Sequence, residues 1–169
     1  MTAPDTPRGC IFTGHRTIPE TRVKILSEIL LSAVDSCYVI GIRDFYAGGA
    51  LGFDTLAADA VLAYRKSHPD VRLHLILPCR GQEDRWSFKD KFAYRKQLSR
   101  ADTVTYLAPA YYDGCMRARH RALVEHGTLC LAYMTNPRSG SAQTWRMAQA
   151  AGLRCVNLAN SFAPLPEGV

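Results

Sequence analysis

Short runs of β-forming residues alternate along this chain with longer segments whose apolar residues recur at helical spacing. The six runs cover residues 10–13, 44–47, 72–77, 103–107, 128–133 and 154–158. Alternation of this kind predicts βαβ units and a largely parallel sheet. Because the runs are nearly all apolar, helices should cover both faces of that sheet. The sequence therefore predicts an α/β fold, a doubly wound three-layer sandwich.

The helical segments carry their own boundary signals. Thr17 and Glu20 form a capping-box pattern around Pro19, which predicts a helix over residues 18–34. Two further helices are expected over 52–64 and 84–98. The second of these should bury Trp86, Phe88, Phe92 and Leu98.

Two more helices are expected in the last third of the chain. One should start at Asp113 and end at Gly127, and the other should run from Ser141 to Gly152. Glycine is the preferred residue just past the end of a helix. These two glycines therefore mark the expected helix ends.

The length of 169 residues fits a single domain. We expect that domain over residues 1–162 and a loose tail over 163–169. No uncharged apolar run approaches the roughly 18 residues of a membrane span, and the first residues lack the apolar core of a signal peptide. These patterns predict a cytoplasmic protein with no membrane partner.

Positive charge is concentrated in one segment. The chain has a formal net charge of +6. Residues 80–121 hold ten basic and five acidic residues, a net of +5. Such a field favours anionic partners, from nucleotide phosphates to nucleic acid. The alternative is a solvated helix face, on which mixed charges are usual.

The six cysteines show no C-x-x-C pair and no matching histidine spacing, so no metal site is expected. Cys10, Cys130 and Cys155 lie in apolar runs, where a thiol behaves as a small buried hydrophobe. Cys79 and Cys115 fall in expected loops. Either is a candidate nucleophile, although no histidine adjoins them in the sequence.

Polar residues and glycines follow the expected strands. In a parallel sheet, ligands bind beyond the carboxyl ends of the strands, where the strand order reverses. The candidate ligand-binding residues after the first, third and fourth strands are Gly14, Arg16, Pro78, Gln82 and Tyr112.

Two of these loops are glycine-containing turns that open directly into helices. The first loop holds Gly48, Gly49 and Gly52, and the second holds Ser139, Gly140 and Ser141. Free backbone N–H groups and the positive end of a helix dipole hold phosphate well at such positions. The alternative is that the glycines only permit tight turns.

The loops match neither of two common nucleotide motifs. Gly49-x-x-Gly52 lacks the first part of the G-x-G-x-x-G fingerprint, and no G-K-[ST] occurs. A dehydrogenase-type site and a Walker-type ATPase are therefore both disfavoured.

The segment 46–58, YAGGALGFDTLAA, resembles the SG-x-A-x-G-x-D segment of DNA-processing proteins of the DprA type. The chain as a whole is similar to the small YpsA-like proteins, which belong with DprA and the LOG enzymes to the SLOG superfamily. The supporting matches are Thr13-Gly14-His15-Arg16, Leu77-Pro78 with Gln82, Trp86 and Tyr94, then Tyr112, Met116 and Arg119, and Gly140-Ser141.

This resemblance implies a Rossmann-like sheet and a pocket for a nucleotide or a nucleotide-derived ligand. LOG-type phosphoribohydrolases have a glutamate in a P-G-G-x-G-T-x-x-E loop. If Gly140-Ser141 matches the G-T pair, Thr144 stands at the glutamate position, which argues against hydrolysis. Asp54 and Glu125 are then the candidate catalytic carboxylates.

Other candidates have two interpretations each. Arg16 would bind a phosphate or form a salt bridge, and Asp54 would bind a ribose hydroxyl or stabilise the start of its helix. Trp86 and Tyr94 would pack in the core or stack on a base. Of Arg117 and Arg119, which point to different sides of a helix, the resemblance favours Arg119 for the pocket.

His15 and His120 are candidate acids or bases, although a lone histidine is more often a hydrogen-bonded structural group.

These observations lead to three hypotheses about the function of the protein. The leading one is a sensor or regulatory protein that binds a phosphate-bearing nucleotide, with no certain cofactor. The others are a nucleotide-processing hydrolase and a single-stranded DNA binding protein. A homo-oligomer is compatible with the fold, although no apolar stripe indicates one.

Overall fold

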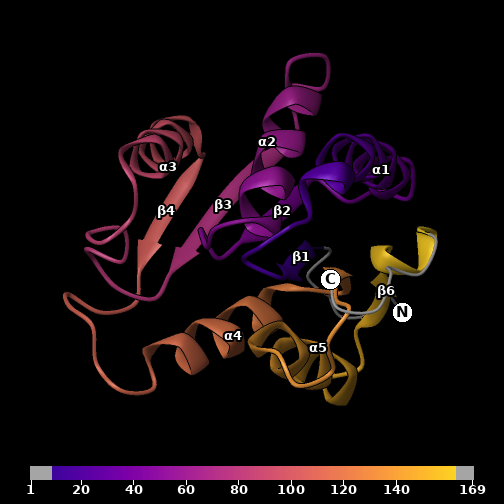
Figure 1. Ribbon diagram of the computed structural model, residues 1–169. Coiled ribbons are helices and arrows are strands. Elements are labelled where there is room, and N and C mark those ends of the chain that lie inside the picture. Colours follow the sequence, from indigo (N-terminus) through magenta and orange to yellow (C-terminus); the bar gives the residue numbers. More distant parts are fainter. Residues whose placement is uncertain (1–8, 163–169) are drawn as a thin grey trace, which may run out of the picture.

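The computed structural model describes residues 9–162. Its six strands form one sheet in which every pair is parallel, in the order β4-β3-β2-β1-β5-β6 (Figure 1). The strands are β1 Gly9–Gly14, β2 Asp44–Ala47, β3 Arg72–Leu77, β4 Thr103–Tyr106, β5 Leu129–Tyr133 and β6 Arg154–Asn157. The helices are α1 Glu20–Val39, α2 Phe53–Arg65, α3 Phe88–Arg100, α4 Cys115–His126, α5 Gly140–Ala150 and a short 3₁₀ helix η1 Leu158–Ser161.

The helices cover both faces of the sheet. In Figure 1, α1, α2 and α3 lie on one face, and α4 and α5 lie on the other. The larger core lies under α1 and α2 and includes Phe12, Phe45 and Phe53, each fully buried. A smaller core, which includes Ile11 and Leu123, lies under α4 and α5. The expected Rossmann-like three-layer sandwich is thus confirmed, with each predicted strand within one residue of its observed bounds.

The strand order reverses next to β1. From β1, the chain adds β2, β3 and β4 on one side and then crosses to add β5 and β6 on the other. At such a switch point the loops after the two central strands turn away from each other and leave a crevice between them. The loops after β1 and β5 therefore define the expected ligand edge.

The start of α1 differs from the expected capping box. The helix begins at Glu20 with Pro19 as its N-cap residue, and no side chain caps it. Thr17 lies two residues before that N-cap, too early to accept from the first turn. The helix also extends to Val39 instead of ending near residue 34.

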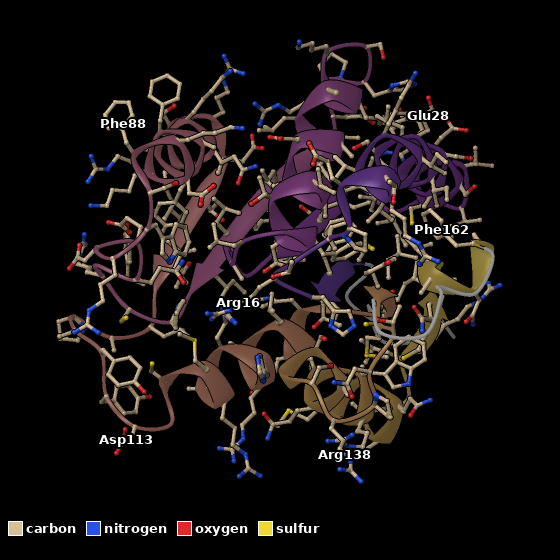
Figure 2. The ribbon with its side chains drawn as sticks, viewed as in Figure 1. Arg16, Glu28, Phe88, Asp113, Arg138 and Phe162 are labelled. Atoms are coloured by element: carbon tan, nitrogen blue, oxygen red, sulfur yellow. The ribbon has the colours of Figure 1, made fainter. Side chains whose placement is uncertain are left out.

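The prediction for α3 was wrong in one respect, because Phe88 and Phe92 are not buried. They are 85% and 64% exposed, and Figure 2 shows Phe88 on the outer side of the helix. The helix starts later than expected, after its N-cap Ser87. It is attached to α2 through polar contacts, in which the Gln97 amide donates to the Thr55 carbonyl and the Asp59 carboxylate at 2.9 and 2.8 Å. This side of the helix faces the protein, so the two phenylalanines face outward.

The predicted ends of α4 and α5 are confirmed within two residues. Gly127 directly follows α4, and Gly152 has a φ of +83°, in the left-handed region that favours glycine.

All six cysteines are free. Cys115 is the first residue of α4 instead of a loop residue, and both it and Cys79 are buried. Burial raises the pKa of the Cys79 thiol, which argues against a nucleophilic role.

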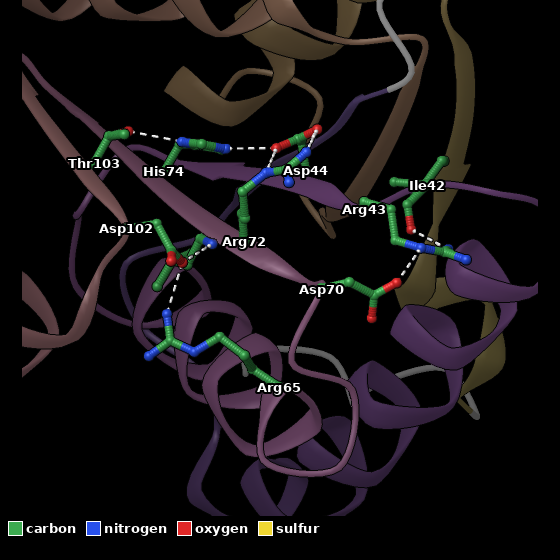
Figure 3. Close-up of polar contacts among 10 residues, drawn as sticks. Ile42, Arg43, Asp44, Arg65, Asp70, Arg72, His74, Asp102 and Thr103 are labelled. Atoms are coloured by element: carbon green, nitrogen blue, oxygen red, sulfur yellow. Dashed lines mark hydrogen bonds and ion pairs between the residues drawn. The ribbon is translucent and has the colours of Figure 1, made fainter.

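Ion pairs connect the strands at the opposite, amino edge of the sheet (Figure 3). Asp44 at the start of β2 accepts from Arg72 at 2.7 Å and from His74 at 2.8 Å. The other ring nitrogen of His74 lies 2.7 Å from the Thr103 hydroxyl. This network joins β2, β3 and β4 far from the ligand edge, so its charges are structural.

Candidate functional site

A cavity of about 370 Å³ opens at the carboxyl edge of the sheet, at the switch point between β1 and β5. We call it the anion cavity. Its lining comes from β1 and the loop after it, from the loop before α2, from α4 and from the start of α5. The lining residues are Phe12, Thr13, Gly14, His15, Arg16, Ala50, Asp54, Met116, Arg119, His120, Leu123, Ser139, Gly140 and Ser141.

His15 joins the two loops that flank the switch point. Its Nε2 accepts the backbone N–H of Thr135 at 2.7 Å. Because Nε2 accepts, the ring proton of the neutral imidazole is on Nδ1, which faces the Ser141 hydroxyl at 3.4 Å. Desolvation lowers the pKa of His15, which favours this neutral form. The geometry fits a hydrogen-bonded structural group.

The first turn of α5 presents backbone donors to the cavity. Ser139 is the N-cap residue, and its hydroxyl accepts from Ala142 N at 3.3 Å while lying 2.9 Å from the Ser141 hydroxyl. The N–H groups at the start of a helix have no partner within it. With Ala142 N capped, those of Gly140 and Ser141 remain at the cavity.

Gly140 has free space in front of it. A Cβ built on this glycine would meet no heavy atom within 4 Å, and its φ is not positive. Neither packing nor backbone conformation therefore requires glycine here. Gly140 is exposed and lines the cavity.

Two arginines line the cavity. The exposed Arg16 has no ion pair or side-chain hydrogen bond to any of the residues 9–162, and Figure 2 shows it between the edge of the sheet and α4. Arg119 is only 6% exposed. Its Nη1 donates to the Gly48 carbonyl at 3.1 Å, while its buried Nε has no partner within the described part of the chain. Arg117 is exposed and lies outside the cavity, so of the two arginines the structure places Arg119 at the cavity.

Asp54 is the one carboxylate among the lining residues. It is buried in the first turn of α2 and accepts from Ala50 N at 3.1 Å. Desolvation raises its pKa, and the nearby Arg119 acts in the opposite direction. With both histidines neutral, the two arginines outnumber the single carboxyl group, so the lining is net positive. The cavity therefore favours an anion.

The glycines of the 48–52 loop lie against protein atoms instead. Gly49 and Gly52 have φ values of +68° and +74°, which favour glycine. A Cβ on Gly52 would lie 2.3 Å from the Arg16 carbonyl oxygen, and one on Gly49 would lie 2.4 Å from Leu77. Neither glycine lines the anion cavity. These contacts fit the tight-turn interpretation of this loop.

The remaining candidates separate into three places. Gln82 and Trp86 line a second hollow, described below. Tyr94 is buried and packs edge-on against Trp86, with ring centroids 5.2 Å apart. Pro78 is buried, whereas Tyr112 and Glu125 are exposed, and these three line neither hollow. Glu125 is thus outside the cavity that a catalytic carboxylate would have to reach.

His120 lines the cavity, which its sequence position alone did not indicate. It lies one position after Arg119 on α4, is buried, and has its Nδ1 3.2 Å from the Gln143 side-chain oxygen. Burial and the nearby Arg119 lower its pKa to about 4. Thr13 and Leu123 also line the cavity, although no sequence pattern singled them out as lining residues. Thr13 directly precedes Gly14, and Leu123 follows Arg119 by one helical turn, so both positions carried a signal.

Within residues 9–162, no group of three or more histidine, cysteine or acidic side chains could hold a metal ion. The same residues form no helix that is long and apolar enough to cross a membrane.

Comparisons with known proteins agree with this architecture. A family model described as the YspA SLOG family, YpsA, matches residues 10–152. The chain is 25% identical over 135 residues to the UPF0398 protein BH1768 of Halalkalibacterium halodurans, a match that covers 79% of this chain and 69% of that protein.

Two solved structures of DNA processing protein A have the same fold. The Helicobacter pylori protein, described for its single-stranded DNA binding mode, matches with a TM-score of 0.62 at 18% identity, over 89% of this chain and 65% of that one. The Streptococcus pneumoniae protein matches with a TM-score of 0.62 at 16% identity, over 88% and 49%. The chain thus spans about two thirds or less of these two structures.

Proposed function

This chain belongs to the YpsA family of SLOG proteins, and we propose that it binds a nucleotide or nucleotide-derived ligand through its phosphate groups, as a sensor or regulatory protein. The observation that carries this proposal is the convergence of three anion-binding features on one cavity. These are Arg16, Arg119 and the first turn of α5. They come from separate parts of the chain and meet only at the switch point.

The chemistry of these groups suits phosphate oxygens. Arg16 has a guanidinium with no other protein partner among the described residues, and Arg119 adds a second guanidinium to the cavity lining. Hydrogen bonds to charged groups contribute about 1.5–3 kcal/mol each, and a helix N-terminus adds about 0.3–1 kcal/mol. Together these groups contribute about 3–7 kcal/mol, a large share of the roughly 8 kcal/mol that micromolar binding requires.

Hydrolysis of that ligand is less well supported. The Asp54 carboxylate is held by Ala50 N, and Glu125 lies outside the cavity. Thr144, at the position matched to the LOG glutamate, is fully buried and does not line the cavity. A general acid or base must reach the scissile bond, and this arrangement favours binding without turnover.

A ligand screen tests the proposal. Thermal shift and calorimetry with AMP, ADP, NAD and pyrophosphate should detect at least one ligand with a dissociation constant below about 100 μM. Arg16→Ala should weaken that ligand tenfold or more, while Arg117→Ala, an exposed arginine outside the cavity, should leave its affinity unchanged. A folded protein that binds none of these compounds would refute the proposal.

A second candidate function is single-stranded nucleic acid binding, and the exposed face of α3 favours it. Phe88 and Phe92 lie one helical turn apart on this face. Lys91, Arg95 and Lys96 flank them around a shallow surface hollow. Exposed aromatic rings among basic side chains stack on bases and hold the phosphate backbone.

Fluorescence anisotropy with a labelled oligo(dT) tests this second function. The affinity should fall steeply between 50 and 200 mM salt, at least tenfold if three or more phosphates are contacted. The double variant Phe88→Ala/Phe92→Ala should weaken binding tenfold or more, while Val39→Ala, an exposed apolar residue on α1, should not. Salt-independent binding would exclude this function.

A further inference from the structure

A second hollow adjoins the anion cavity. We call it the Trp86 recess. Its lining consists of Arg16, Cys79, Gly81, Gln82, Asp84, Arg85, Trp86, Tyr111 and Met116. Arg16 and Met116 also line the anion cavity, so the two hollows meet at these two side chains. A ligand that extends past Arg16 therefore enters the recess.

The chemistry of the recess differs from that of the anion cavity. It contains two large aromatic side chains, Trp86 and Tyr111, which the anion cavity lacks, and its charged residues besides Arg16 are Asp84 and Arg85, of opposite sign. Aromatic faces suit planar heterocycles, since stacking on them tolerates any base. A carboxylate and an amide oxygen accept hydrogen bonds from the exocyclic amino and ring N–H groups of such heterocycles. The aromatic side chains and these acceptors therefore make the recess suited to a base.

Trp86 is held in place from behind. Its ring packs edge-on against the buried Tyr94, whose hydroxyl accepts from the Gln82 amide at 3.1 Å. The same amide nitrogen also lies 3.2 Å from the Gly49 carbonyl. Both contacts use the amide nitrogen, which leaves the Gln82 side-chain oxygen available as an acceptor. The indole is thus positioned before any ligand arrives, which lowers the entropic cost of binding.

The turn before Trp86 brings Asp84 to the recess. Gly81 has a φ of +77°, and a Cβ there would lie 2.7 Å from the Asp84 carboxylate. The backbone N–H of Asp84 donates to the Gly81 carbonyl at 3.1 Å. Tyr111, from the loop between β4 and α4, is 67% exposed although it lines the recess. An apolar ring exposed to this extent beside a hollow is available to cover a ligand.

We propose that the Trp86 recess binds the base of a nucleotide whose phosphates lie in the anion cavity, with the ligand passing Arg16 between them. The ligand class is therefore a nucleotide with both a nitrogenous heterocycle and a phosphate, and not a simple phosphate ester or sugar phosphate. This inference rests on the proposed function and adds to it the position of the base.

Tryptophan fluorescence tests the position of the base directly. The chain has two tryptophans, Trp86 and Trp145. In a Trp145→Phe variant, Trp86 is the only indole, so AMP and ADP should change its emission saturably. Ribose 5-phosphate carries the phosphate without the base and should leave the emission nearly unchanged. AMP should bind at least tenfold more tightly than ribose 5-phosphate, which corresponds to about 1.4 kcal/mol.

Two variants test whether the recess causes the tighter binding of AMP. Trp86→Leu and Tyr111→Ala should each remove most of the tenfold advantage of AMP while changing the ribose 5-phosphate affinity less than twofold. Tyr112→Ala is the matched control, because this exposed neighbour of Tyr111 lines neither hollow. Tyr111→Ala also keeps the test valid if Trp86→Leu impairs folding.

The two proposals fail in different ways. If AMP binds no more tightly than ribose 5-phosphate, or if both recess variants retain wild-type AMP affinity, the base does not occupy the recess and this inference is wrong. If neither compound binds, and pyrophosphate and NAD also fail, the phosphate site itself is wrong and both proposals fall.

Discussion

The side chains of Asp54 and Arg119 converge on the α-carbon of Gly48. A methyl group on this glycine would lie 3.2 Å from the Asp54 carboxylate and 3.0 Å from the Arg119 Nε. Asp54 comes from the start of α2 and Arg119 from α4, so side chains from the helix layers on the two faces of the sheet meet at Gly48. A buried carboxyl group and a buried guanidinium thus lie near each other at the wall of the anion cavity.

The Asp54→Asn variant should show whether Asp54 stabilises the fold, contacts the ligand, or does both. Loss of the carboxylate leaves the buried Arg119 without its compensating charge, which should destabilise the fold by about 1–3 kcal/mol in urea unfolding. The same change raises the net charge of the cavity lining, so pyrophosphate should bind severalfold more tightly at low salt. Weaker pyrophosphate binding would contradict this view. Weaker AMP binding together with tighter pyrophosphate binding would show that Asp54 holds the ribose.

Stability should fall as the pH falls from about 6.5 to 4, in part because of His120. Its pKa is about 4 in the folded protein and about 6.5 in an unfolded chain. Between these values the unfolded chain takes up a proton that the folded protein does not, so acid favours unfolding, by up to about 3 kcal/mol. Urea unfolding at pH 7 and pH 4.5 should show a smaller loss for His120→Gln than for the wild type. An equal loss in both proteins would exclude His120 as a contributor.

Two glycines next to the site should respond oppositely to alanine. Gly52 has a φ of +74° and no room for a Cβ beside the Arg16 carbonyl. Gly52→Ala should therefore lower the free energy of unfolding by about 2 kcal/mol or more. Gly140 has an ordinary backbone conformation and open space. Gly140→Ala should raise the free energy of unfolding by up to about 0.5 kcal/mol, because alanine loses less chain entropy. Thermal unfolding checks both, and a stable Gly52→Ala variant would contradict the described loop.

Periodicity made most of the fold predictable. The strands β1 and β5 are almost entirely buried, and their apolar runs reveal that directly. The exposed face of α3 could not be predicted in the same way. Phe88 and Phe92 have the spacing of a buried stripe, but the buried side of this helix is formed partly by Gln97, whose amide bonds to α2. Apolar spacing does not reveal a helix that is attached through polar contacts.

The edge of the sheet at which the candidate site lies was predictable, but the contacts of the individual loop residues were not. The rule that ligands bind at the switch point correctly brought Arg16, Ser139 and Ser141 together. It could not tell that Gly49 and Gly52 turn toward protein atoms, because a glycine-rich loop has the same sequence whether it cradles a ligand or another part of the chain. The pairing of Arg119 with Gly48 is likewise a long-range contact that no local spacing encodes.

Calorimetry of ADP binding to a Ser141→Asp variant tests the phosphate site most directly. A carboxylate at the second residue of α5 suits the helix start, so the melting temperature should change by only a few degrees. It would, however, occupy the position where the phosphate meets the first turn of α5. We predict that the ADP affinity falls tenfold or more, a loss of about 1.4 kcal/mol, while Arg117→Ala binds ADP like the wild type. An unchanged dissociation constant in Ser141→Asp would show that the start of α5 is a turn and not a phosphate site.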